Sequence, residues 1–198
     1  MSPALAMIIA WALWAASWLA AAKWSDAVAN RASSGEQWLY RILAAAGALL
    51  LLFRFDDIFQ GRYRVWDLGL GANWTLVAIA ALGLMFTWWA RLYLGRLWSR
   101  SVTKKGDHRV VDAGPYAIVR HPIYTGMIVA IFAAAVLKGM PIGVAGAILI
   151  ALAFWIKARL EERFLREQLG PDAYDSYRRR VPMLIPWIRN RPDDGAKV

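Results

Sequence analysis

Apolar residues are gathered into five long blocks along this chain, and polar residues fill the stretches between the blocks. The apolar blocks cover residues 3–22, 38–53, 74–94, 122–137 and 141–156. An α-helix needs about 20 predominantly apolar residues to cross the hydrocarbon core of a bilayer. The pattern therefore predicts an all-α, polytopic integral membrane protein with about five transmembrane helices.

The last two blocks are separated only by Lys138, Gly139 and Met140, which predicts a tight C-terminal helical hairpin. The first block has no positively charged leader before it, so we expect it to be a retained span rather than a cleaved signal. No repeat or low-complexity linker divides the chain. We therefore expect a single domain, residues 1–198, with three N-terminal spans in 1–94 and the polar motifs in 95–198.

The composition agrees with a membrane protein and removes several kinds of chemistry. Hydrophobic residues make up 59% of the chain, above the roughly half that is usual in soluble domains. No cysteine is present, which excludes disulfides, thiol nucleophiles and Cys-ligated metals. Only His108 and His121 could be imidazole ligands, and no carboxylates accompany them at metal-ligand spacing. We expect no metal cofactor.

The Lys and Arg residues are distributed unequally between the two sides of the predicted membrane spans. If the five spans alternate, 20 of the 24 Lys and Arg residues lie on one side of the membrane and 4 lie on the other. Cytoplasmic loops carry the excess of basic residues, so we expect the N-terminus outside and the C-terminus in the cytoplasm. The net charge of +10 then indicates contact with anionic membrane lipids and not with nucleic acid.

A polar motif, "RHPIY", stands directly before the fourth block at residues 120–124. Pro122 disfavours helix at His121 and suits the first position of a helix, so a helix should begin there. The backbone N–H groups of Ile123 and Tyr124, the helix dipole, and the side chains of Arg120 and His121 then form an anion site. A carboxylate of a ligand would fit it, although an ordinary membrane-boundary helix would have a similar sequence.

A second polar motif follows the fifth block. Lys157 and Glu161 are four residues apart and share a helix face, as do Glu162 and Arg166. A solvated helix with surface ion pairs would explain most of these charges. Two adjacent glutamates beside a membrane span are costly without a partner or a function, however. The sequence therefore places candidate functional carboxylates at Glu161 and Glu162.

Together, "HRVVDAGPYAIVRHPIY" and "EERFLREQLGPDAYDSYRRRVP" carry a resemblance. Residues 91–186 resemble the isoprenylcysteine carboxyl methyltransferase family and related membrane methyltransferases with RHPxY and paired-glutamate motifs. The N-terminal half matches in hydropathy alone. The resemblance implies an S-adenosylmethionine-dependent methyltransferase whose cofactor site faces the cytoplasm and whose catalytic part is 95–198.

The resemblance also implies roles for particular residues. Lys157 stands where eukaryotic members have an arginine associated with the substrate; lysine keeps the charge but lacks the planar guanidinium, and Arg159 is a nearby substitute. The residues implied to bind S-adenosylmethionine are His108, Arg109, Val110, Val111, Tyr116, His121, Pro122, Ile123, Tyr124 and Glu161.

A carboxylate acceptor and an amine acceptor place different demands on the site. A carboxylate needs no general base at neutral pH, only alignment by a cation such as Lys157 or Arg159 and exclusion of water. An amine would first have to lose a proton, and Glu162 is the nearest candidate base.

We therefore expect methyl transfer from S-adenosylmethionine to a carboxylate of a prenylcysteine-like or other lipophilic substrate. The alternatives are a phospholipid or amine N-methyltransferase, an NADPH-dependent membrane reductase of the sterol-reductase type, and a non-catalytic membrane protein. No glycine-rich dinucleotide loop is present, since "GLG" at 69–71 lacks the strand and helix that such a loop joins.

Overall fold

A computed structural model of the protein describes residues 1–22, 34–52, 64–95 and 111–186. All regular secondary structure in these ranges is helical, which confirms the all-α prediction. In chain order the helices are α1 (Pro3–Ala22), α2 (Ser34–Leu52), α4 (Gly69–Leu94), α6 (Pro115–Ile118), α7 (Pro122–Lys138), α8 (Pro141–Leu169) and α9 (Pro171–Arg180).

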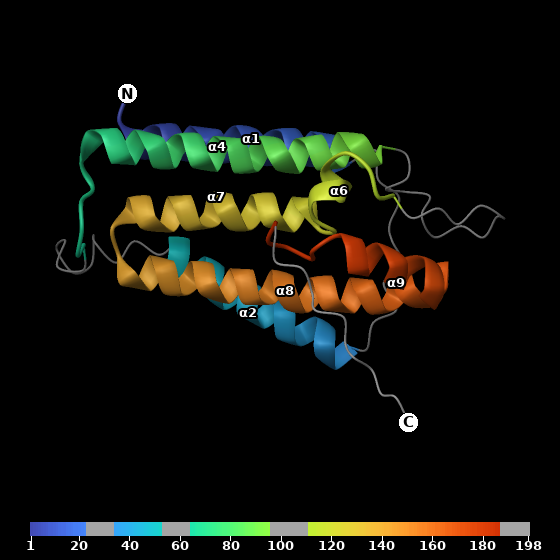
Figure 1. Ribbon diagram of the computed structural model, residues 1–198. Helices are drawn as coiled ribbons and strands as arrows, with labels where there is room; N and C mark the ends of the chain where they lie inside the picture. The colour runs from blue at the N-terminus through green and yellow to red at the C-terminus, as the bar shows by residue number, and fades with distance from the viewer. Residues whose placement is uncertain (23–33, 53–63, 96–110, 187–198) are drawn as a thin grey trace.

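The long helices run antiparallel to their neighbours in the chain. In Figure 1, α1 and α4 form one side of the molecule, α7 lies in the middle, and α8 and α2 form the other side. α4 ends, α7 begins and α8 ends at the same end of the molecule, where the short helices α6 and α9 also lie (Figure 1). The two polar motifs, far apart in sequence, therefore meet at one end. Which side of a membrane this end faces stays a prediction.

The long helices expose large apolar side chains. Among the described residues, α1, α4 and α8 are long and apolar enough to cross a membrane, while α2 and α7 are apolar but shorter. Large apolar side chains such as Leu13, Leu82 and Ile148 are exposed on these helices. Contiguous exposed apolar surface marks contact with a partner or with lipid. Membrane association is supported, and five crossings stay a prediction.

The C-terminal hairpin forms, and its second arm, α8, continues beyond the apolar block 141–156. It continues to Leu169 and ends at Gly170, whose φ of 84° favours glycine. Residues 157–168 are mostly Lys, Arg, Leu and Glu, which are good helix formers, so the helix does not stop where the apolar block stops. Glu161 and Glu162 consequently lie on the same continuous helix as the apolar block, and the helix predicted for the charged stretch is confirmed.

Each arm of the hairpin packs more extensively on an N-terminal helix, α7 on α4 and α8 on α2, than on the other arm. Glycines face each other at both crossings. A Cβ built on Gly83 of α4 would lie 2.7 Å from the Gly126 carbonyl oxygen of α7. A Cβ on Gly47 of α2 would lie 2.6 Å from the Gly146 carbonyl oxygen of α8. Small residues permit such close helix approach in membranes.

We expect Gly83→Ala to destabilise the protein by about 1–3 kcal/mol, because the added methyl group would overlap the backbone of α7. Gly71→Ala, on the same helix, is the matched control, since nothing lies within 4 Å of a Cβ there. It should be neutral or slightly stabilising. Unfolding of the two variants in mixed detergent micelles measures the difference; equal stability would contradict the close crossing.

Candidate functional site

The first polar motif is held in place by a tail segment, residues 181–184, that follows α9. The Arg120 backbone N–H donates to the Pro182 carbonyl (2.9 Å), and the His121 N–H donates to the Met183 carbonyl (3.1 Å). Thr125 Oγ1 donates to the Leu184 carbonyl at 2.6 Å. The stretch before α7 therefore has a fixed backbone, and α7 begins at Pro122 as predicted.

α9 anchors this tail segment. Tyr174 and Tyr177 are buried and pack with Val181. The Tyr177 hydroxyl donates to the Tyr116 carbonyl oxygen at 2.7 Å, which ties α9 to α6. Burial raises the pKa of both Tyr174 and Tyr177 above the ordinary tyrosine value. Both phenols therefore stay protonated at physiological pH and act as hydrogen-bond donors or packing groups, not as bases.

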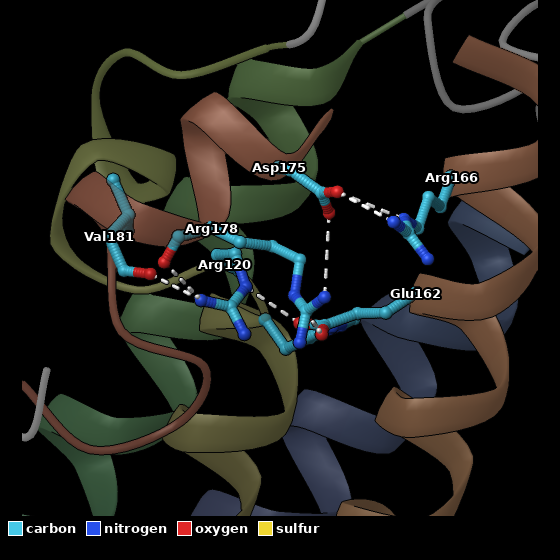
Figure 2. Close-up of polar contacts among 7 residues, drawn as sticks. Arg120, Glu162, Arg166, Asp175, Arg178 and Val181 are labelled. Carbon is cyan, nitrogen blue, oxygen red and sulfur yellow. Dashed lines mark hydrogen bonds and ion pairs between the residues drawn. The ribbon is translucent and has the colours of Figure 1, made fainter. Parts of the chain in front are cut away.

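Arg120 lies at the centre of the buried contacts between the two motifs. Its Nε donates to Glu162 Oε1 at 2.6 Å, and both side chains are almost fully shielded from solvent. Its Nη1 donates to the carbonyls of Val181 and, at 3.2 Å, Arg178 (Figure 2). These two carbonyls lie where α9 ends and the tail segment begins. Arg120 is thus committed to protein partners at its Nε and Nη1 atoms.

His121 and Arg178 complete what we call the buried ion-pair cluster: Arg120, His121, Glu162 and Arg178. Arg178 Nε lies 3.5 Å from Glu162 Oε2. His121 Nε2 lies 3.3 Å from Glu162 Oε1 without hydrogen-bond geometry, so this buried nitrogen has no hydrogen-bond partner among the described residues. Its Nδ1 lies 3.7 Å from Glu161 Oε2. His121 therefore stands between the two glutamates.

The two glutamates have different surroundings. The Glu162 side chain is 9% exposed and the Glu161 side chain is 36% exposed. Tyr124 donates its hydroxyl to Glu161 Oε1 at 2.6 Å, and Lys157 Nζ lies 3.9 Å from the same oxygen. We call Tyr124, Lys157 and Glu161 the Glu161 cluster. A ligand can reach the carboxylate of Glu161, whereas that of Glu162 is enclosed by cations.

Aromatic rings line the Glu161 cluster. The His121 and Tyr124 rings stack with centroids 5.5 Å apart, and Tyr124 stacks on Phe154 at 5.0 Å. Lys157 Nζ lies 5.2 Å from the centroid of the Tyr124 ring. The face of this ring is thus already placed to attract a positive charge.

Tyr116 of α6 lies near the same carboxylate. Burial raises the pKa of Tyr116 above its ordinary value, and the negative charge of Glu161 raises it further. Tyr116 therefore keeps its proton and can donate a hydrogen bond, but it cannot serve as a base near neutral pH.

The structure brings together most of the residues that the sequence singled out, from Tyr116 and the 120–124 motif to Lys157, Glu161 and Glu162. Arg159 is elsewhere: its guanidinium lies 4.9 Å from the ring of Trp155. Val111 precedes α6 in an irregular stretch, and His108, Arg109 and Val110 lie outside the described residues.

Sequence reasoning did not find Phe154, the buried role of Arg178, or the tail segment as part of the site. The spacing of Phe154, Lys157 and Glu161 at intervals of three and four residues is the signal that could have found Phe154, because such residues share a helix face. No comparable local signal marks the tail segment, whose contacts reach back across α7 and α8.

Comparisons with known proteins find sequences similar to this chain. Residues 75–167 match the family model described as the isoprenylcysteine carboxyl methyltransferase (ICMT) family, a stretch that contains both polar motifs.

Methanethiol S-methyltransferase 1 of Bradyrhizobium diazoefficiens is 32% identical over 168 residues, 78% of this chain and 56% of the relative. Methanethiol S-methyltransferase of Mycobacterium tuberculosis is 45% identical over 76 residues, 36% of this chain and 28% of the relative. Protein-S-isoprenylcysteine O-methyltransferase of Schizosaccharomyces pombe is 33% identical over 105 residues, 50% of this chain and 43% of the relative.

The aligned part thus spans little more than half of the first relative's length and less than half of the other two. The residues matched by the family model, 75–167, include Arg120, His121 and the two glutamates that the structure joins. The family match over residues 75–167 and these relatives therefore support the resemblance of this chain to the isoprenylcysteine carboxyl methyltransferase family.

Proposed function

We propose that this protein is an integral membrane methyltransferase that uses S-adenosylmethionine, bound at the Glu161 cluster. The observation that carries the proposal is the contrast between the two glutamates. The Glu162 side chain is 9% exposed and paired with the buried Arg120, whereas the Glu161 side chain is 36% exposed beside the stacked rings of His121 and Tyr124. One carboxylate holds the protein together and the other is available to a ligand.

The side chains present fit the groups of this cofactor. A sulfonium is a cation, and the face of Tyr124 already attracts the cation of Lys157. The carboxylate of Glu161 suits an ammonium or hydroxyl donor, and the buried Nε2 of His121 lacks a hydrogen-bond partner among the described residues. When bound, S-adenosylmethionine supplies an electrophilic methyl group. His108–Val111, Pro122 and Ile123 remain proposed parts of the same site through the family resemblance.

The protein's own groups have separate tasks in this proposal. The buried ion-pair cluster fixes the backbone at Arg120 and His121, so Tyr124 and Glu161 are held in position before a ligand arrives. Such alignment contributes to catalysis without any proton transfer. Tyr116 stays protonated and donates. Glu162 is paired with Arg120 and buried, so we assign it positioning and not general-base work.

Tyr116 keeps its proton and Glu162 is paired with Arg120, so neither is available as a base, which favours an acceptor that is already anionic. A carboxylate of a prenylcysteine-like or other lipophilic molecule is the first candidate, with Lys157 as the cation that positions it; Arg159 stacks on Trp155 and is not retained in this role. A small thiol is the second candidate, because methanethiol S-methyltransferases align with up to 78% of this chain. Unlike a carboxylate, it must first lose its proton to the solvent and then react as the thiolate.

A labelling experiment separates these functions. Membranes containing the protein are incubated with methyl-labelled S-adenosylmethionine and, in turn, a prenylcysteine analogue, a small thiol and an aminophospholipid. A base-labile product indicates a methyl ester, a volatile one a thioether, and a base-stable lipid an amine. No labelled product and no cofactor binding would overturn the proposal and leave the non-catalytic alternative; oxidation of added NADPH would favour the reductase.

We expect Lys157→Met to lower turnover of the anionic acceptor about tenfold or more while changing cofactor affinity less, because it removes the cation that faces the acceptor. Arg179→Met, which removes an exposed cation of α9, is the matched control. Initial rates and cofactor dissociation constants are measured on both variants. Equal loss of cofactor affinity and of turnover in Lys157→Met would contradict this role.

A further inference from the structure

A second polar site lies on the other face of α8. A pocket of about 460 Å³ is lined by Trp155, Ile156, Arg159, Glu162, Arg163, Arg166 and Arg178. Trp155, Arg159, Arg163 and Arg166 follow one another at intervals of four, four and three residues and so share a helix face. Lys157 and Glu161 project from a different face, toward Tyr124 of α7. We call this second site the arginine pocket.

The arginine pocket lies where the apolar part of α8 gives way to its charged part. Trp155 and Ile156 are the last residues of the apolar block of α8, and the arginines begin with Arg159, one turn after Trp155. Tryptophan and arginine are the side chains that anchor helices at the membrane interface, with apolar parts in lipid and polar parts in the headgroup region. One wall of the pocket is thus apolar and the rest is cationic.

The balance of charge in the arginine pocket is positive. Arg166 binds Asp175 through Nε (3.1 Å) and Nη2 (2.8 Å), and Arg178 Nη1 reaches the other oxygen of Asp175 at 3.5 Å, as Figure 2 shows. Glu162 already accepts from Arg120 at 2.6 Å. Among its described lining residues, the pocket has four arginines and one carboxylate, that of Glu162, so its wall is strongly cationic.

We propose that the arginine pocket binds the phosphate of an anionic membrane phospholipid, with the start of an acyl chain lying on Trp155 and Ile156. Guanidinium groups match the geometry of phosphate oxygens through paired N–H donors. Basic pockets beside membrane helices collect such headgroups. The apolar wall is the reason for preferring a lipid to soluble phosphate, which would not cover the exposed apolar surface of Trp155 and Ile156.

The arginine pocket and the buried ion-pair cluster have Glu162 and Arg178 in common. Arg178 belongs to α9, the helix that anchors the tail segment, and its neighbour in the pocket, Arg166, is joined to the same helix through Asp175. A headgroup bound here contacts both α8 and α9 and bridges them beside the proposed cofactor site. The binding itself does not depend on methyl transfer.

The test is made on the full chain purified in neutral detergent. Native mass spectrometry counts the phosphatidylglycerol or phosphatidylcholine retained at equal added concentration. We expect wild-type protein to retain phosphatidylglycerol preferentially, and Arg159→Gln/Arg163→Gln to lose about tenfold or more in its affinity. Arg41→Gln/Arg179→Gln, which removes two exposed arginines elsewhere, should retain it. Arg159→Lys/Arg163→Lys, which keeps the charge, should fall between.

Three outcomes would overturn the proposal. Unchanged phosphatidylglycerol retention in Arg159→Gln/Arg163→Gln would remove the pocket as the site. An equal loss in the control pair would mean that the lipid is attracted by surface charge in general. Displacement of phosphatidylglycerol by the same concentration of inorganic phosphate would assign the site to a soluble anion. Thermal unfolding of every variant in the same detergent confirms that folded protein is compared.

Discussion

Replacing Arg120 with methionine should destabilise the protein by about 3–5 kcal/mol, because the carboxylate of Glu162 would remain buried without its closest cation. Arg120 donates to Glu162 at 2.6 Å, and the Arg120 side chain is 1% exposed, so water cannot replace the lost hydrogen bond. The carbonyls of Val181 and Arg178 would lose their donor as well. Denaturation in mixed detergent micelles, followed by tryptophan fluorescence, measures the effect.

Two controls make this prediction specific. Asp112→Asn breaks a pair with Arg180 whose side chains are 40% and 62% exposed, and should cost less than about 1 kcal/mol. Arg120→Met/Glu162→Met removes both charges and should recover part of the stability, since no charge is left buried alone. Equal stability of Arg120→Met and Asp112→Asn, or a double variant no better than the single one, would refute the importance of this ion pair.

Glu161→Ala and His121→Ala should each weaken binding of S-adenosylmethionine by at least about tenfold, since each removes a polar partner worth roughly 1.5–3 kcal/mol to a charged ligand group. This expectation rests on the proposed cofactor site. Glu161→Ala is easier to interpret than His121→Ala, because the Glu161 side chain is 36% exposed and its removal leaves the buried ion-pair cluster intact. Equilibrium dialysis with labelled cofactor measures the affinities.

The neighbouring glutamates provide an internal comparison. Glu161→Gln should lose affinity with little change in stability, whereas Glu162→Gln should lose stability first, because its partner Arg120 is then buried without a counter-ion. Glu167→Gln, an exposed carboxylate further along α8, should change neither. Wild-type cofactor affinity in folded Glu161→Ala and His121→Ala would remove the Glu161 cluster as the cofactor site. An equal loss of cofactor affinity in Glu167→Gln would show an effect of net charge alone.

The sequence by itself determined the local features of this protein. It fixed the all-α class through the length of its apolar blocks, and the beginnings of α7 and α8 through Pro122 and Pro141, because proline at a first helical position acts on its own backbone. It also pointed to both polar motifs. The family resemblance joined them, and the family match now supports that interpretation.

The extent of α8 beyond the apolar block was indicated by the spacing of its charged residues and not by hydropathy. The block ends at residue 156, but the i, i+4 pairs that follow it predicted a helix, and α8 continues to Leu169. Helix propensity depends on the backbone and on side-chain entropy, and it does not require apolar residues. A hydrophobic pattern marks where a helix can meet lipid and not where it stops.

Only the tertiary structure decided what each polar residue does. Glu161 and Glu162 are adjacent in sequence but about 100° apart around α8, so one faces Tyr124 and the other faces Arg120, from positions 37 and 42 residues away in the chain. Lys157 and Arg159 also lie on different faces of α8: Lys157 lies near Tyr124, and Arg159 lies over Trp155. Periodicity shows which residues share a face; which neighbour covers that face depends on helix packing and on a tail segment whose hydrogen bonds reach back some 60 residues, and neither is encoded in the local pattern.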